Sequence, residues 1–145
     1  MNASQLSHRP GVPGIIAAAV LFLAACPGLS WADQTKVTLS GAQEVPAVTT
    51  AASGSGTITI NADKSVSGSV STTGVAGTMA HIHNGAAGAN GPVIIPLTKN
   101  GDTWSVPAGA KLTDEQYAAY KAGNLYVNVH SAANKGGEIR GQLKP

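Results

Sequence analysis

Three histidines carry the clearest chemistry in this sequence. His81 and His83 are one residue apart in AHIHNGAAGANGPV (80–93), and His130 ends LYVNVH (125–130). Side chains two positions apart in a β-strand point to the same face, so His81 and His83 would lie side by side. Neutral imidazole binds zinc, copper, iron and nickel, and a metal site needs ligands that converge from more than one strand. We therefore predict that the three histidines form a metal site for copper or zinc.

The alternation of side chains predicts which face of each strand carries the site. In LYVNVH the leucine and the two valines form an apolar face, so Asn128 and His130 lie on the opposite, outer face. In EIRGQL (138–143) the same alternation places Glu138 and Arg140 on the outer face, where we expect them to pair with each other. The alternative is that these histidines are only solvated or hydrogen-bonded side chains on an exposed strand face.

The remaining candidate residues point to no other chemistry. Glu44 lies in GAQEVPAV (41–48) and has no partner acid with which to form a hydrolytic pair. The glycines of the 85–91 segment are followed by a strand pattern rather than by a helix N-terminus, which argues against a phosphate-binding loop. We expect these glycines to let the backbone turn tightly beside the histidines, and we expect no organic cofactor.

Composition favours a single β-rich domain. The chain has 145 residues, with 18 glycines and only 4% aromatic residues, while valine, isoleucine, threonine and serine recur in short runs. Nine Lys and Arg residues balance seven Asp and Glu residues without forming a basic cluster. We therefore expect no nucleic-acid partner.

The first 32 residues have the pattern of a signal peptide. The apolar run IIAAAVLFLAA (15–25) is followed by Pro27 and Gly28 and by small residues before Ala32. This run is too short for a transmembrane helix, so we predict no membrane span. Cleavage after Ala32 would leave residues 33–145 as one secreted or periplasmic β domain. Alternatively, LAAC (23–26) is a lipobox, and the protein is a lipoprotein anchored through Cys26.

The mature chain alternates strand patterns with turn signals, which predicts an all-β fold: an antiparallel Greek-key β-sandwich or barrel. One short connecting helix is expected at about 113–121. Thr113 would be its N-cap, Gln116 the reciprocal partner in a capping box, and Gly123 its C-terminal stop. The predicted strands are 36–41, 56–60, 66–75, 79–83, 93–97, 125–130 and 138–143, with a further piece at TWSVP after the NGD turn.

Four sequence blocks, spread over about residues 36–143, resemble the CHRD (chordin-type) domain family. They are LSGAQEVPAV, AHIHNGAAGANGPV, LYVNVHS and GGEIRGQL, in that order. The resemblance implies an all-β domain outside the cytoplasm that acts as a binding or structural module. It implies an extracellular or envelope partner without identifying it.

A second similarity concerns the histidines. HIHNGAAG is similar to the H-V-H-x-x-G segment of copper/zinc superoxide dismutases, which are Greek-key sandwiches. This resemblance implies that His81, His83 and His130 are copper ligands and that Arg140 is a catalytic, anion-attracting arginine. The fourth copper-ligand histidine and the zinc-site cluster are missing. A CHRD-type module with a three-histidine site is therefore our first hypothesis, and a copper-dependent superoxide dismutase-like enzyme is the alternative.

Overall fold

The computed structural model of the protein describes residues 32–145. The predicted signal sequence and the lipid anchor at Cys26 lie outside the described residues, so both stay predictions. Within the described residues, no helix has the length and hydropathy that a membrane-spanning helix needs.

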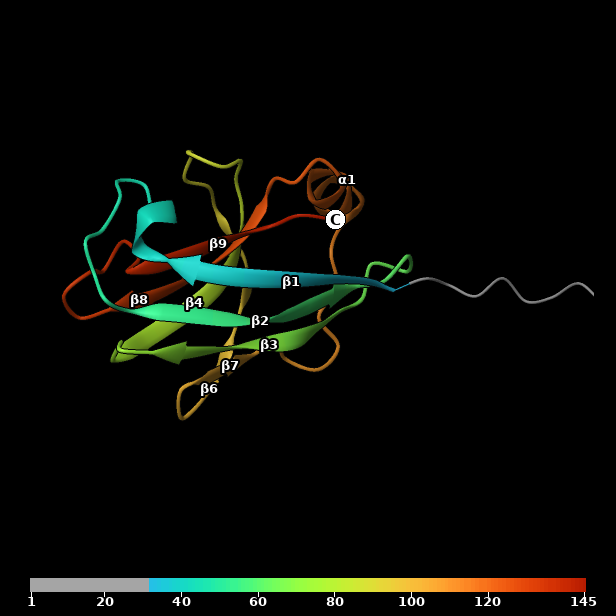
Figure 1. Ribbon diagram of the computed structural model, residues 1–145. Helices are drawn as coiled ribbons and strands as arrows, with labels where there is room; N and C mark the ends of the chain where they lie inside the picture. Colours follow the sequence, from blue (N-terminus) through green and yellow to red (C-terminus); the bar gives the residue numbers. More distant parts are fainter. Residues whose placement is uncertain (1–31) are drawn as a thin grey trace, which may run out of the picture.

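The described chain forms one antiparallel sheet (Figure 1). The order of its strands is β5-β4-β8-β9-β1-β2-β3-β7-β6, so the strand that carries His130 lies between the strand that carries the other two histidines and the last strand. The strands are β1 (Asp33–Ser40), β2 (Ser53–Ile60), β3 (Val66–Thr73), β4 (Gly77–Asn84), β5 (Val93–Pro96), β6 (Thr98–Asn100), β7 (Thr103–Ser105), β8 (Leu125–Ser131) and β9 (Ile139–Leu143).

The sheet curls until its two edges almost meet, which makes it a barrel. The edge strands β5 and β6 are separated only by Leu97, and the Leu97 N–H donates to the carbonyl of Ala80 in β4 at 2.9 Å. Closure of this kind leaves few unpaired backbone groups at a sheet edge. The predicted all-β antiparallel fold is confirmed, and the barrel-like form is the one adopted.

The inner face of the barrel holds the core that the alternation predicted. Val127 and Val129 of β8, Ile82 of β4, and Ile139 and Leu143 of β9 are all fully buried. Their neighbours in each strand must then point outward, because successive strand residues alternate between faces. This fixes the histidines on the outside of the barrel wall.

The predicted helix is confirmed as α1 (Asp114–Lys121), at one end of the barrel beside the C-terminus (Figure 1). Its capping box is complete: the Thr113 hydroxyl accepts from the Gln116 N–H, and the Gln116 side chain accepts from the Thr113 N–H. The buried Tyr120 ties the helix to β1 through a 2.8 Å hydrogen bond with Thr35. A short 3-10 helix, η1 (Gly41–Gln43), follows β1.

Other segments cover much of the outer face of β4, β8 and β9, whereas Met79 near the start of β4 stays exposed. Tyr126, Asn128 and Arg140 on this face are at most 2% exposed. Three connections cover them, namely the 85–92 loop after β4, the segment around Glu44 after η1, and the 132–138 loop between β8 and β9. The outer wall therefore contains a second, polar interior.

Candidate metal site

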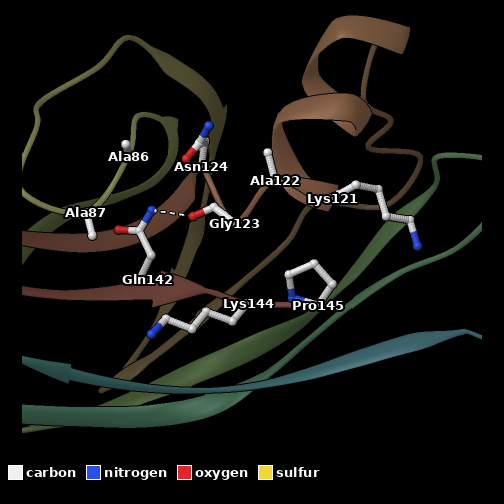
Figure 2. A pocket seen from close by; sticks show the side chains of 9 residues that line it. All are labelled: Ala86, Ala87, Lys121, Ala122, Gly123, Asn124, Gln142, Lys144 and Pro145. Atoms are coloured by element: carbon white, nitrogen blue, oxygen red, sulfur yellow. Dashed lines mark hydrogen bonds between the residues drawn. The ribbon is translucent and has the colours of Figure 1, made fainter.

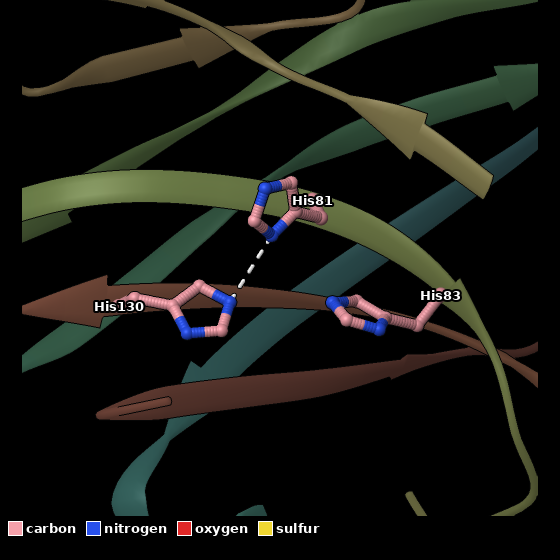
Figure 3. A group of neighbouring side chains, drawn as sticks. All are labelled: His81, His83 and His130. Atoms are coloured by element: carbon pink, nitrogen blue, oxygen red, sulfur yellow. Dashed lines mark hydrogen bonds between the residues drawn. The ribbon is translucent and has the colours of Figure 1, made fainter. Parts of the chain in front are cut away.

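The structure brings the three predicted histidines together (Figure 3). His81 and His83 come from β4 and His130 from β8, and one ligand atom of each ring lies within 4.8 Å of those of the other two. His81 Nδ1 and His130 Nε2 are 3.1 Å apart. Figure 3 shows a nitrogen of each ring turned toward the other rings, which is the convergence that a metal ion requires.

Two of the rings are held by backbone carbonyls. His83 Nδ1 lies 2.9 Å from the Gly91 carbonyl oxygen, and His130 Nδ1 lies 2.8 Å from the Lys135 carbonyl oxygen. A carbonyl oxygen only accepts hydrogen bonds, so Nδ1 must carry the hydrogen in both rings. In the neutral rings Nε2 is then the acceptor: that of His130 accepts from His81 Nδ1, and that of His83 has a free lone pair. Hydrogen bonds to Nδ1 orient histidine ligands around metals in the same way.

Burial favours the neutral form of His81 and His83 and leaves one nitrogen unpartnered. Burial lowers the pKa of His81, and the neighbouring His130 and His83 lower it further. Burial also lowers the pKa of His83, against the opposing effect of its bond to the Gly91 carbonyl. The Nε2 atom of His83 is buried and has no hydrogen-bond partner among the described residues. A buried acceptor of this kind requires an explanation, and a bound ion supplies one.

His83 is the end member of a stack of three side chains, in which Tyr126 lies between His83 and Arg140. The Tyr126 ring lies parallel to the His83 ring, with centroids 4.8 Å apart and an interplanar angle of 7°. The guanidinium of Arg140 lies 3.5 Å from the Tyr126 centroid, within range of a cation–π interaction. The Tyr126 hydroxyl accepts from the Gly91 N–H at 3.2 Å. The stack thus joins β4, β8, β9 and the 85–92 loop.

Arg140 anchors this loop and does not face solvent. It donates to the carbonyls of Ala86 and Ala89 at 2.8 and 2.9 Å, and to Gln142 at 3.1 Å, while only 1% of the residue is exposed. This arrangement gives no support to an arginine that attracts anions from solution. The anchoring role of Arg140 could not be predicted from the sequence. Its acceptors in the 85–92 loop are backbone carbonyls, which every residue type has.

Glu138 does not pair with Arg140, so that expectation is wrong. Its carboxylate accepts a 2.8 Å hydrogen bond from the Thr50 hydroxyl. Hydrogen bonds from Ser131 and Thr50 lower the pKa of Glu138. Glu138 directly precedes β9, and its backbone N–H donates to the Val129 carbonyl of β8. Its side chain connects the 132–138 loop to Thr50, in the segment that precedes β2.

Glu44 is the acid that does reach the polar interior. It is 5% exposed and lies beside Asn128, and Oε1 of Glu44 and Oδ1 of Asn128 both lack hydrogen-bond partners among the described residues. Burial raises the pKa of Glu44 to about 7, although Arg140 and Asn128 act to lower it. A Cβ atom at Gly137 would overlap both side chains, so only glycine allows the two to lie there. This close approach was not visible in the sequence pattern.

The 85–92 loop offers a test of how the site is held. A Cβ atom at Gly91 would overlap the Asn84 carbonyl, whereas one at Gly88 would meet only open space. We expect Gly91→Ala to lower the free energy of unfolding by about 2 kcal/mol. Gly88→Ala should cost no more than about 1 kcal/mol, from its positive φ of 80°. Urea unfolding measures both values, and equal losses would show that the loop does not depend on this contact.

A separate pocket of about 610 Å³ lies at the C-terminal end of α1 (Figure 2). Lys121, Lys144 and Pro145 line it, together with Gln142, whose side chain donates to the Gly123 carbonyl at 2.9 Å. Its lining residues supply ammonium and amide groups but no histidine, thiol or carboxylate side chain. The side chains of this pocket therefore offer none of the usual protein ligands of copper or zinc.

Comparison with known proteins identifies the family of the chain. The family model for the CHRD domain matches residues 35–143, a span that includes all three histidines, Glu44, Asn128, Glu138 and Arg140. No match was found among curated proteins or among solved structures. Because the family model covers most of the chain, and all of the barrel except Asp33 and Gln34, the protein belongs to the CHRD domain family.

Proposed function

We propose that this CHRD domain is a binding module whose ligand is a single copper or zinc ion, held by His81, His83 and His130. The observation that carries the proposal is the buried, unpartnered Nε2 of His83 beside two further imidazoles. Both metals accept neutral imidazole, and three such ligands leave a coordination position open. The loops that cover the outer wall hold the rings in place before the metal arrives.

A module that binds without turnover fits the surroundings of the histidines better than a redox enzyme does. The superoxide dismutase-like alternative needs a cation that draws anions toward the metal, and Arg140 is instead bound to loop carbonyls. Membership in the CHRD family supports a binding or structural module. The buried groups around His83 are those expected of a rigid ligand cage.

Calorimetric titration of the protein with Cu(II) and with Zn(II) tests the proposal. We expect one saturable site per chain for at least one of the two metals. His81→Ala should weaken binding at least about tenfold. Lys36→Ala is the control, because Lys36 is exposed in β1, a strand that carries none of the three histidines, and its loss should leave binding unchanged. Binding that is not saturable, or that His81→Ala leaves unchanged, would contradict the proposal.

The pH dependence of the same titration follows from the histidine pKa values. Protons compete with the metal for the ring nitrogens, so affinity falls as pH falls. Since burial lowers the pKa values of His81 and His83, this loss should begin below the ordinary histidine value of about 6.5. A loss of affinity that is complete above that pH would show that other groups bind the metal.

A further inference from the structure

A methionine lies beside the histidine cluster on the same face of the sheet. Met79 precedes His81 by two positions in β4, and it is the direct cross-strand partner of His130 in β8. Residues directly opposite each other in an antiparallel pair have Cβ atoms about 4.5–5.5 Å apart and point to the same face. Met79 therefore flanks the two histidines whose ring nitrogens are 3.1 Å apart.

Met79 also lies where the cluster is open. His83 and His130 are buried and His81 is half-buried, so solvent reaches the cluster on the His81 side. Met79 is 50% exposed, which is unusual for a large apolar side chain in the described residues. Its unbranched side chain has three rotatable bonds and ends in a polarisable thioether, so the sulfur can turn toward a bound ion without movement of the strand.

We propose that the site binds Cu(I), with the Met79 thioether joining His81, His83 and His130 as a fourth ligand. This inference rests on the proposed three-histidine site and names its metal. Thioether sulfur is a soft ligand that selects Cu(I), whereas protein zinc sites use thiolate, imidazole and carboxylate.

The charges around the site favour a monovalent ion. All four donors are neutral, and the cationic Arg140 acts electrostatically on His83 from within the same polar interior. The acid that could offset this charge, Glu44, has a pKa raised to about 7, so it is only partly ionised near neutral pH. A divalent ion is therefore repelled more strongly than Cu(I) at the same position.

Anaerobic competition against a chromophoric Cu(I) chelator tests the assignment on the whole protein. Met79→Leu keeps the apolar volume and removes the sulfur, so Cu(I) binding should weaken at least about tenfold while Zn(II) binding stays unchanged. Lys36→Leu is the control, since it places the same leucine side chain at an exposed position of β1, a strand that holds none of the proposed ligands. It should change neither affinity.

The outcomes separate this inference from the proposed function. If Met79→Leu binds Cu(I) as the wild type does while His81→Ala binds it more weakly, the three-histidine site stands and the thioether ligand is overturned. If His81→Ala also binds as the wild type does, both proposals fail.

A direct readout comes from the methionine methyl group. The chain has two methionines, Met1 and Met79, so protein labelled with ¹³C at the methionine methyl gives a simple spectrum. Addition of one equivalent of Ag(I), a redox-stable substitute for Cu(I), should shift the Met79 signal and leave Met1 in place. A Met79 signal that does not move would overturn the proposal.

Discussion

Replacing Arg140 by leucine should lower the free energy of unfolding by about 2–4 kcal/mol, as expected for a buried charged group that loses several partners. Arg140 has three hydrogen-bond acceptors and lies on the Tyr126 ring, and these contacts hold the 85–92 loop on the barrel wall. The loop also supplies the carbonyl that orients His83. Metal affinity should therefore fall together with stability.

The geometry of the guanidinium, rather than its charge alone, should account for this effect. Arg140→Lys keeps the charge, but a single ammonium group cannot reach the Ala86 and Ala89 carbonyls and also lie flat on Tyr126. We expect lysine to restore less than half of the lost stability in urea unfolding. The control Lys36→Leu, at an exposed position of β1, should stay within about 0.5 kcal/mol of the wild type. Full restoration by lysine would contradict the anchoring role.

Replacing Glu44 by glutamine should stabilise the protein at pH 8, by up to about 3 kcal/mol, since one pKa unit corresponds to about 1.4 kcal/mol. Burial raises the pKa of Glu44 from 4.5 to about 7, so the folded state prefers the protonated acid. Below pH 4.5 the acid is protonated in both folded and unfolded states, and the two proteins should be equally stable. As pH rises to about 7 the wild type loses stability relative to the variant, and above 7 the difference is constant.

The difference between the two proteins is the quantity to measure. His81 and His83 also titrate near this range, with lowered pKa values that make stability rise with pH, but they are present in both proteins and cancel. Glu115→Gln is the control, because the pKa of this exposed acid is lowered by its backbone hydrogen bond at the helix start. Its effect should be small and opposite in sign. A Glu44→Gln difference that does not vary between pH 4 and 8 would show that the folded state does not hold the acid protonated.

Local patterns predicted the strands and the helix, because alternation and helix capping depend on neighbours in sequence. Alternation identified the core residues of β8 and β9, and the Thr113 capping box located α1. The strand β6 (Thr98–Asn100) was missed, since three exposed polar residues carry no alternation signal. β1 begins at Asp33, three residues before the predicted start at residue 36, because Asp33 still pairs with Ile60 of β2.

The same patterns predicted the meeting of the histidines but not the environment around them. Alternation and strand pairing were sufficient to place His81, His83 and His130 on one face. The burial of Asn128 and Arg140 on that face depends on connections that cross it from distant parts of the chain. The only sign of these connections in the sequence was its glycines. Gly91 and Gly137 lie where any side chain would overlap a neighbour, but the sequence does not show which neighbour that is.

Electron paramagnetic resonance of the protein loaded with one equivalent of Cu(II) tests the central claim most directly, because it detects the imidazole nitrogens bound to the ion. The account predicts coordination by His81, His83 and His130, with the loss of one imidazole in His81→Ala and in His130→Ala. Lys36→Ala, at an exposed position of β1, a strand that carries none of the three histidines, should leave the spectrum unchanged. A copper spectrum that is the same in the wild type and in both histidine variants would contradict the account.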